Sequence, residues 1–426
     1  MSAPQDHVVI VGAGFGGIEV ARRLGAAGIR TTLIDRHNHH LFQPLLYQVA
    51  TAALSPADIA EPVRKVLRGN ESVEVLLDEV IGIDTAQRAV SLAGGGRISG
   101  DWLVIATGAT HSYFGHDDWA PFAPGLKTIE DARQIRSRLL LAFEEAEMSH
   151  DPAEQKRLMT IAVIGGGPTG VELAGSIAEL ARHTLSKDFH RIRPHTATVL
   201  LLEAGSRILT AFPEDLADYA TRKLKMLGVV LRLNTPVERI TANSVTAKGE
   251  NIRVGFAIWA AGVMASPLGK MLGMPTDRAG RVAVNPDLSV PGLNNVYALG
   301  DVTQLAGEDG KPLPGLAQVA KQEGIYLGRA LAKKIATGAS SPPFRFHNRG
   351  NTAIIGRNAA IFDFGWWRLR GWFAWIFWAF IHVYLLVGFQ HRLMVAIQWL
   401  WRYVTYEGGS RLIAEDVHPP DNRTAR

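Results

Sequence analysis

This chain contains the same series of elements twice: a strand, a glycine-rich turn, a helix, and a second strand that ends on an acidic residue. In the first copy the strand His7–Val11 leads into glycines, a helical pattern follows through Leu24, and residues 30–34 form a strand ending on Asp35. Glycines in such a turn let backbone N–H groups approach a pyrophosphate, whose charge is favoured at a helix N-terminus. The first copy therefore predicts a dinucleotide site.

The second copy repeats this order. A strand at residues 161–164 precedes the turn, a helix is predicted over residues 171–182, and a strand at Thr198–Leu202 ends on Glu203. Glu203 lies farther from its glycines than the usual separation of about 20 residues, and residues 183–195 account for the excess as an insertion. Two copies predict an α/β fold with two Rossmann-like dinucleotide-binding domains.

The chain contains no cysteine. This absence excludes disulfides, thiolate metal sites, cysteine-bound iron–sulfur clusters and redox dithiols. Redox chemistry in this chain must therefore belong to an organic cofactor. The neighbouring His37, His39 and His40 have no supporting cluster of acids or cysteines, and we predict no metal site.

The last 80 residues differ in composition from the rest. Residues 345–426 hold ten arginines, five acidic residues and seven of the ten tryptophans, whereas residues 1–344 contain 35 basic and 35 acidic residues. The aromatic residues lie within long apolar runs. A basic, tryptophan-rich region of this kind favours an anionic membrane surface over nucleic acid as its partner.

Two helical segments are predicted in this C-terminal region. Residues 371–389 are apolar on every helical face except at His382, and about 20 helical residues suffice to cross a bilayer. Residues 393–404 are amphipathic instead. Tryptophan and arginine cluster at the ends of both segments, as anchors at an interface would. The sequence leaves spanning and in-plane attachment both open.

A late strand that delivers Gly300 and Asp301 completes a recognisable layout. Over residues 1–340 the chain resembles the flavoproteins with two dinucleotide-binding domains, which implies FAD at the first site, a nicotinamide nucleotide at the second, and Asp301 near the flavin ribityl or phosphate groups. The implied FAD contacts are Gly12, Gly14, Phe15, Gly16, Gly17, Asp35, Arg36, Val80, Thr107, Gly108, Asp301, Ala317 and Gln318. The implied NADH contacts are Gly165, Gly167, Pro168, Thr169, Gly170, Glu172, Glu203 and Gly262.

The same resemblance implies the domain boundaries. We expect an FAD-binding domain formed by residues 1–158 and 276–344, with an NADH-binding domain at residues 159–275 between its two parts. Residues 345–426 are expected to anchor the protein to a membrane. These boundaries make the predicted FAD domain discontinuous in sequence.

Three strings narrow the resemblance to the type II NADH:quinone oxidoreductases. They are QPLLYQVAT at residues 43–51, GGGPTGVE at residues 165–172 and AQVAKQ at residues 317–322. The third resembles the quinone-site pattern Ala-Gln-x-Ala-x-Gln of that family. The resemblance implies a FAD-dependent enzyme that oxidises NADH and reduces a membrane quinone without pumping protons.

The third string has a physical rationale of its own. Gln318 and Gln322 are four residues apart, so they share one face of a helix, and their amides can donate to a quinone carbonyl. Ala317 and Ala320 are small enough to let a ring system approach the backbone. By spacing alone, a surface helix with two unremarkable glutamines fits equally well. With the resemblance, Gln318 and Gln322 are candidate catalytic residues.

Glu172 lies in the first turn of the second glycine-turn helix. An acid there is favourable against the helix dipole without any further role. The resemblance implies a carboxylate near the nicotinamide and flavin, which would tune binding or help deliver protons to quinone. We therefore predict Glu172 as the third catalytic residue, since hydride transfer itself needs only positioning.

The acid at the end of the second unit predicts nucleotide preference. A carboxylate at Glu203 accepts hydrogen bonds from ribose hydroxyls and repels a 2′-phosphate, so we expect NADH over NADPH. Arg207 lies nearby and would weaken this preference.

Two alternatives share the nucleotide sites. A soluble reductase of a ferredoxin or rubredoxin partner predicts a hydrophilic C-terminus, whereas a membrane-bound NADH sensor needs no paired glutamines. The N-terminus enters a strand pattern at once, and we expect a location on the cytoplasmic face of the inner membrane. The resemblance further implies monotopic attachment through a homodimer.

Overall fold

The computed structural model describes residues 6–308, 310–386, 389–405 and 411–413, which form two compact units. The described residues of Met1–Leu41, Ala60–Thr110 and Val263–Arg349 make the first unit. Those of Phe42–Ile59, His111–Gly262 and Gly350–Arg426 make the second. Residues 42–59 and 111–158, assigned to the FAD domain in the sequence-based prediction, thus cluster with the second unit.

The first unit is built on a five-stranded parallel sheet. Its order is β20-β9-β1-β2-β5, with β1 in the middle. Each strand is a short apolar run, as expected for a parallel sheet buried on both faces. The strands are β1 (His7–Val11), β2 (Arg30–Asp35), β5 (Val73–Leu77), β9 (Trp102–Ile105) and β20 (Val296–Ala298).

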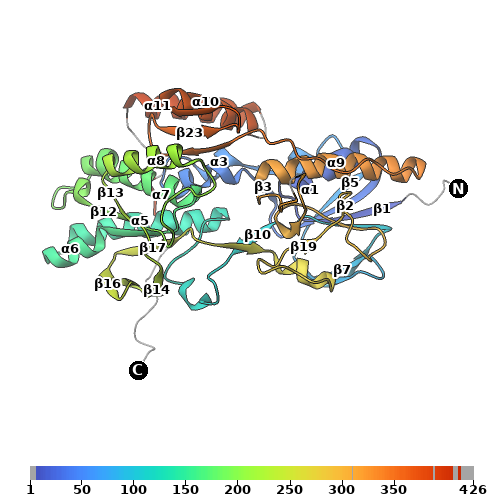
Figure 1. Ribbon diagram of the computed structural model, residues 1–426, viewed down its shortest axis with the longest axis horizontal. Coiled ribbons are helices and arrows are strands. Elements are labelled where there is room, and N and C mark those ends of the chain that lie inside the picture. Colours follow the sequence, from blue (N-terminus) through green and yellow to red (C-terminus); the bar gives the residue numbers. More distant parts are fainter. Residues whose placement is uncertain (1–5, 309, 387–388, 406–410, 414–426) are drawn as a thin grey trace. The chain divides into compact units, whose positions relative to one another are not determined.

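Helices α1 (Phe15–Ala26) and α9 (Ala317–Thr337) lie side by side against this sheet (Figure 1). Glycines make the close approach possible. A Cβ atom at Gly324 of α9 would lie 2.3 Å from the carbonyl oxygen of Gly16, and one at Gly328 would lie 2.7 Å from the Cβ of Arg23. The packing places the start of α9, which carries the paired glutamines, beside the first glycine turn.

The remaining elements of the first unit are short. A three-stranded antiparallel sheet and two small strand pairs flank the main sheet. These elements are β3 (His39–Leu41), β4 (Ala60–Pro62), α4 (Val63–Val66), β6 (Val80–Asp84), β7 (Ala89–Leu92), β8 (Arg97–Ser99), β18 (Val263–Ala265), η6 (Pro267–Leu272), β19 (Val282–Ala283), η7 (Gly300–Val302) and β21 (Thr303–Gln304). Strand β10 (Ala109–His111) lies where the chain passes from the first unit to the second.

The second unit contains a four-stranded parallel sheet of order β13-β12-β11-β17. Helix α7 (Pro168–Glu179) follows β11 directly, as the second glycine turn predicts, and continues into a π-helical turn at Leu180–Thr184. The insertion expected at residues 183–195 begins in this turn. The strands are β11 (Thr160–Ile164), β12 (Thr198–Leu202), β13 (Val229–Arg232) and β17 (Phe256–Trp259).

The long helix α5 spans Ile129–Met148. Its start is set by a capping box. The Thr128 hydroxyl accepts a hydrogen bond from the Asp131 N–H at 3.1 Å, and the Asp131 carboxylate accepts one from the Thr128 N–H at 2.9 Å. This reciprocal pair satisfies two N–H groups that lack partners within the helix.

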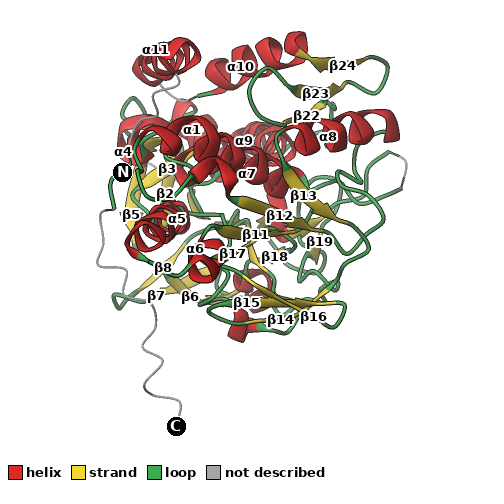
Figure 2. Ribbon diagram, turned by 90° about the vertical axis from the view of Figure 1, so that its left-hand side faces the viewer, coloured by secondary structure: helices red, strands yellow, loops and turns green. Residues whose placement is uncertain are grey.

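Further elements surround the second parallel sheet, including two antiparallel three-stranded sheets (Figure 2). The elements of this periphery are η1 (Gln43–Leu45), α2 (Leu46–Ala50), α3 (Pro56–Ile59), η2 (Asp117–Trp119), α6 (Pro152–Leu158), η4 (Leu185–Lys187), η5 (Pro194–Thr196), α8 (Glu214–Met226), β14 (Val237–Ile240), β15 (Ser244–Ala247), β16 (Glu250–Arg253), β22 (Asn351–Ile354), β23 (Ala360–Asp363) and β24 (Arg368–Gly371).

The C-terminal region forms helices α10 (Trp372–Leu385) and α11 (Phe389–Thr405), with α10 packed on β23 and β24. Both helices are prominent beside β23 in Figure 1. Of the apolar run predicted at residues 371–389, positions 387 and 388 lie outside the described residues. Within the described chain, no helix combines the length and apolarity needed to cross a membrane.

Candidate functional site

The two glycine turns have the same backbone geometry. Gly12 and Gly165, the first glycine of each turn, have φ of +103° and +110°. A Cβ atom at Gly12 would meet the backbone just after β9 at 2.5 Å, and one at Gly165 would meet the backbone just after β17 at 2.6 Å. At Gly17 and Gly170, a Cβ would lie under 2 Å from the carbonyl oxygen of the first glycine, at 1.8 and 1.9 Å. Only glycine fits these four positions.

The helices that follow these turns begin without side-chain caps. Gly14 and Gly167 are the N-cap residues of α1 and α7, and neither has a side chain that could accept a hydrogen bond from the first N–H groups. Those N–H groups carry the positive end of the helix dipole. Each turn is therefore shaped for a pyrophosphate, and the residues fit a dinucleotide in both units.

In the first unit, Asp35 accepts hydrogen bonds from the Ala13 N–H at 2.6 Å and from the His37 N–H at 2.7 Å. Burial alone would raise its pKa, but the hydrogen bonds from His37 and Ala13 together outweigh that effect and lower it. The carboxylate is thus held ionised at the end of β2. It ties the glycine turn to the strand in addition to any contact with a ribose.

In the second unit, Glu203 repeats this arrangement. Its Oε2 accepts from the Gly166 N–H and its Oε1 accepts from the Gly205 N–H, each at 2.6 Å. The residue that follows the first glycine is therefore held by an acid in both copies. This structural role was not visible from the sequence, where both acids were assigned only to contacts with the nucleotides.

Three further predicted FAD residues surround the first glycine turn. Thr107 and Gly108 follow β9, which pairs with β1, so they lie at the same edge of the sheet as the turn. The Thr107 hydroxyl is buried and has no hydrogen-bond partner among the described residues. A buried polar atom without a partner is costly, so its position fits contact with a bound polar ligand. The ring of Phe15 packs edge-on against His40 at 5.2 Å.

Arg36 and Val80 lie at the end of β2 and at the start of β6. The Arg36 guanidinium lies 3.8 Å from the carboxylate of Glu79, and both side chains are exposed. Val80 is buried in the core of the first unit. Packing alone accounts for Val80, whereas the exposed Arg36 is available to a ligand phosphate.

Asp301 lies in the turn η7 directly after β20, as the sequence predicts, and a neighbour that the sequence did not reveal supports this turn. Glu323 of α9 is 1% exposed and accepts a hydrogen bond from the Gly300 N–H at 2.6 Å. The pKa of Glu323 is raised to about 7: burial raises it, the Gly300 N–H opposes the shift, and the nearby Asp301 contributes to the rise. Glu323 therefore positions the backbone that carries Asp301.

The paired glutamines lie on one face of α9, and both bind the chain segment that follows it. The Gln322 amide donates to the His347 carbonyl and accepts from the His347 N–H, each at 3.0 Å. The Gln318 carbonyl oxygen accepts from the Arg349 N–H at 3.1 Å. Gln322 thus uses both ends of its amide on the backbone, and the oxygen of Gln318 is engaged by the backbone as well. Ala317 is the first residue of the same helix.

Pro168 and Thr169 form the first turn of α7, where proline suits the first helical position. Gly262 follows β17 and has a packing role. A Cβ there would lie 2.7 Å from the ring of Phe114 and 2.7 Å from the Ser112 carbonyl oxygen. Phe114 is 67% exposed and has a φ of +54°, which is uncommon for a bulky residue. The sequence offers no signal for this conformation.

Glu172 lies within the second unit at the start of α7. Burial raises its pKa to about 8, and a long hydrogen bond of 3.4 Å from the Ile354 N–H opposes the shift. Gly175 lets the β22 segment approach α7, because a Cβ there would lie 3.1 Å from the Ile355 carbonyl oxygen. Glu172 is therefore a mostly protonated acid at neutral pH that can release a proton.

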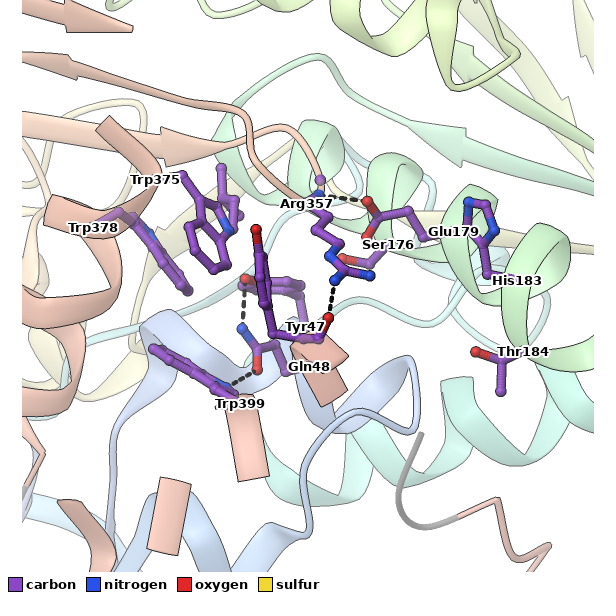
Figure 3. Close-up of a pocket in the computed structure, with 13 residues that line it drawn as sticks. Tyr47, Gln48, Ser176, Glu179, His183, Thr184, Arg357, Trp375, Trp378 and Trp399 are labelled. Carbon is purple, nitrogen blue, oxygen red and sulfur yellow. Dashed lines mark hydrogen bonds between the residues drawn. The ribbon is translucent and has the colours of Figure 1, made fainter. Parts of the chain in front are cut away.

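A pocket lies next to this acid, wholly within the second unit (Figure 3). Its empty space, including the part continuous with solvent, is about 760 Å³. One side is aromatic and comes from α2, α10 and α11; the other side comes from α7 and the turn after β22. The lining residues are Tyr47, Gln48, Ser176, Glu179, His183, Thr184, Ile354, Gly356, Arg357, Trp375, Trp378, Trp399 and Tyr403.

The string at residues 43–51 contributes to this pocket through a hydrogen-bonded chain. The Gln48 NH₂ donates to the Tyr47 hydroxyl at 2.8 Å, and the Gln48 oxygen accepts from the Trp399 Nε1–H at 2.9 Å. Trp399 stacks on Trp378, which in turn stacks on His382. Burial lowers the pKa of His382 to about 4, so this histidine is neutral in the apolar helix.

The chain matches known proteins over most of its length. The profile of the pyridine nucleotide-disulphide oxidoreductase family covers residues 6–324. The type II NADH:quinone oxidoreductase Ndh of Mycobacterium tuberculosis is 40% identical over 427 residues, which cover 97% of this chain and 91% of the relative. NdhA of the same organism is 43% identical over 412 residues, with 93% and 86% covered. The chain belongs to the type II NADH:quinone oxidoreductases.

Solved structures agree with this placement at the level of fold. NDH2 from Plasmodium falciparum in complex with NADH matches with a TM-score of 0.89 at 21% identity, covering 97% of this chain and all of that one. A sulfide:quinone oxidoreductase from Aquifex aeolicus matches with a TM-score of 0.71 at 19% identity over 91% of each chain. The predicted α/β fold with a parallel sheet in each nucleotide-binding unit is confirmed.

Proposed function

We propose that this protein oxidises NADH and transfers the two electrons to a membrane quinone. The observation that carries the proposal is the duplicated glycine turn in a cysteine-free chain that belongs to this family. FAD, when bound, supplies the redox chemistry by accepting a hydride and giving up electrons. The residues of the chain bind and orient the dinucleotides and the quinone, and they supply a proton to the quinone.

The first unit holds FAD. Its glycine turn receives the pyrophosphate, Asp35 keeps that turn in place, and Asp301 faces the ribityl or phosphate groups. The unpaired Thr107 hydroxyl provides a further polar contact. The second unit holds NADH in the equivalent way, with Glu203 selecting against a 2′-phosphate.

Glu172 is proposed to act as the acid in quinone reduction. With a pKa of about 8 it holds its proton near neutral pH, so it can donate to an oxygen that gains negative charge. Gln318 is proposed to donate an amide hydrogen bond to a quinone carbonyl. Gln322 is proposed to hold the segment after α9 in place, and it contacts quinone only if it releases His347.

The membrane surface is proposed to be the exposed face of α10 and α11. Phe373, Phe380 and Leu400 are 70%, 69% and 66% exposed, and large apolar side chains in such a patch indicate an interaction surface. We propose peripheral, monotopic attachment to the cytoplasmic face of the inner membrane, with a homodimer combining two such faces.

The alternatives are less favoured. A soluble reductase of a ferredoxin-type partner leaves the exposed aromatic face of α10 and α11 unused. A NADH sensor has no use for the raised pKa of Glu172. Family membership favours the enzymatic function over both.

The decisive test follows the visible absorbance of purified, FAD-loaded protein. Adding NADH without oxygen should bleach the flavin absorbance, and adding a short-chain ubiquinone should restore it. Failure of NADH to bleach the spectrum would refute the enzyme proposal. Bleaching with recovery by ferredoxin and not by quinone would establish the soluble reductase instead.

A further inference from the structure

A tight turn at residues 113–116 of the second unit has a phenylalanine as its first central residue. The turn is closed by a hydrogen bond from the His116 N–H to the Tyr113 carbonyl oxygen at 3.0 Å. Its central residues, Phe114 and Gly115, have φ of +54° and +92°. Turns with two positive φ values favour asparagine or aspartate followed by glycine, because these residues tolerate the left-handed region. A bulky side chain such as phenylalanine is a clear exception.

The ring of Phe114 gains little from burial in this position. Phe114 is 67% exposed, whereas the neighbouring Tyr113 is 7% exposed and stacks on Trp259 with 5.1 Å between ring centroids. Phe114 meets Trp259 only edge-on, at 6.0 Å. Phenylalanine ordinarily stabilises a fold by burying its ring. An exposed ring on a strained backbone therefore indicates a function other than stability.

Contacts with the end of β17 fix the position of this turn. The Trp259 Nε1–H donates to the Ser112 carbonyl oxygen at 2.8 Å, and the Ser112 N–H donates to the Gly262 carbonyl oxygen at 3.1 Å. The tip of the Phe114 ring lies next to Gly262, where a Cβ atom would be 2.7 Å from it. All four residues belong to the second unit. The ring is thus placed beside the carboxyl end of β17.

The carboxyl end of β17 borders the second glycine turn. A Cβ atom at Gly165, directly after β11, would lie 2.6 Å from the backbone of Ala260 and Ala261, which precede Gly262. In open parallel sheets a dinucleotide lies across the carboxyl ends of the strands, with its pyrophosphate at the glycine turn. The Phe114 ring therefore lies beside the path expected for the nucleotide.

The order of the strands indicates which half of the nucleotide passes Phe114. Strand β11 lies between β12 and β17, so a pyrophosphate at the start of α7 lies between these two strands. Glu203, at the end of β12, is assigned to the adenosine ribose, which carries the 2′-phosphate in NADPH. The nicotinamide riboside must then extend in the opposite direction, toward β17 and the Phe114 ring.

We propose that Phe114 is a binding residue whose ring packs against the nicotinamide riboside half of NADH or NAD⁺. This inference rests on the proposed function, because it assumes that the second unit holds the nicotinamide nucleotide. A ring that is already fixed in place loses little conformational entropy when it contacts a ligand. The strained turn thus holds the ring in its binding position before the nucleotide arrives.

The direct test compares NAD⁺ with ADP, which contains the adenosine and both phosphates but lacks the nicotinamide riboside. Neither ligand reduces the flavin, so calorimetry on FAD-loaded protein measures both dissociation constants. Phe114→Asn removes the ring and keeps the turn, because asparagine tolerates a positive φ. We expect the Kd of NAD⁺ to rise about five- to tenfold and the Kd of ADP to stay unchanged. Phe114→Tyr keeps the ring and should retain the wild-type Kd for both.

Unfolding measurements separate a binding role from a packing role. Because asparagine relieves the left-handed strain, the denaturant midpoint of Phe114→Asn should equal or exceed that of wild type. Phe114→Gly also permits a positive φ and repeats the test if Phe114→Asn does not fold. A lower midpoint in both variants with an unchanged Kd for NAD⁺ would assign the ring to packing. An equal loss of affinity for ADP and NAD⁺ would assign it to the site as a whole, and either result would overturn the proposal.

A matched control lies in the same unit. The hairpin between β15 and β16 has Lys248 and Gly249 as its central residues, with φ of +50° and +72°. Lys248 is exposed. Lys248→Asn therefore makes the same change of backbone preference in a turn that the nucleotide site does not include. It should leave the Kd of NAD⁺ and of ADP unchanged.

The outcomes distinguish this inference from the proposed function. A wild-type Kd for NAD⁺ in Phe114→Asn and Phe114→Gly would overturn the role of the ring and leave the enzyme proposal intact. Wild-type protein whose flavin is not reduced by NADH would overturn the enzyme proposal. The comparison of NAD⁺ with ADP would then still decide the role of Phe114, because it requires no turnover.

Discussion

At the scale of single residues, the acids after the glycine turns serve two purposes. Asp35 and Glu203 each accept two backbone N–H groups, one of them from the turn itself. The positions of both acids could be predicted from the sequence because strand ends and glycine spacing mark them. The hydrogen bonds from the turns to these acids could not be predicted, because they depend on how far each turn folds back over the end of the strand.

This double use leads to a prediction for nucleotide selectivity. Glu203→Gln keeps an oxygen for one backbone N–H but removes the charge that repels a 2′-phosphate. We expect relative use of NADPH to rise, with stability changed by less than about 1 kcal/mol. Glu203→Ala should show the same change of selectivity together with a loss of about 1–3 kcal/mol. Steady-state kinetics with both nucleotides and denaturant unfolding measure the two effects; unchanged selectivity in both variants would exclude the ribose role.

Glu323 gives a prediction for pH. Its pKa of about 7 in the folded protein lies above the usual 4.5, so the folded state holds a proton that the unfolded chain releases first. The contribution of Glu323 to the free energy of unfolding is therefore fully present below pH 4.5 and is lost as pH rises through 7. Glu323→Gln should match wild type at pH 4.5 and exceed it by roughly 2–3 kcal/mol at pH 8. Denaturant unfolding across this range is the measurement, and parallel curves would contradict the assignment.

At the scale of elements, helices and strands could be predicted from the sequence, whereas the point at which one helix type changes into another could not. The start of α5 is set by a capping box at Thr128 and Asp131, which is a local feature of the chain. The end of α7 was predicted at residue 182, whereas the α-helix stops at Glu179 and a π turn follows. That turn packs against the short helical turns η4 and η5, which is a tertiary contact. Glu323 was missed for the same reason, because only the contact between α9 and the Gly300 turn explains a buried acid there.

Disturbing the packing between α1 and α9 should weaken FAD binding in particular. Gly324→Ala places a methyl group where only 2.3 Å separates it from the Gly16 carbonyl oxygen, so one helix must move. We expect a loss of about 1–3 kcal/mol and weaker retention of FAD, because the displaced helix follows the glycine turn. Arg329→Ala, at an exposed position of the same helix, is the control. Wild-type FAD content in purified Gly324→Ala would show that the turn tolerates the shift.

At the scale of the whole molecule, the sequence predicted two nucleotide-binding units but not which segments complete each one. Strand and turn patterns identify a unit by its local order. The assignment of residues 42–59 to the second unit depends instead on contacts such as that between Gln48 and Trp399, which are 351 residues apart. No local sequence pattern indicates a contact between residues so far apart in the chain.

The apolar face of α10 and α11 should bind anionic vesicles. Phe373→Glu and Phe380→Glu each remove an exposed aromatic group and add a repelled charge, so we expect the fraction bound to fall on the order of tenfold per substitution. Met148→Glu changes a side chain that is 75% exposed on α5 and should have no effect. Co-sedimentation with vesicles rich in phosphatidylglycerol is the measurement. Equal binding of all three variants would place the membrane contact elsewhere.

The partnership between residues 42–59 and the C-terminal helices has a consequence for biosynthesis. Trp399 and Gln398, which bind Gln48 and Asp58, are made 351 and 340 residues later than their partners. Until then Gln48 and Asp58 lack these hydrogen-bond partners. Truncation before α11 should leave both hydrogen-bond partners missing and make the chain a substrate for chaperones and proteases.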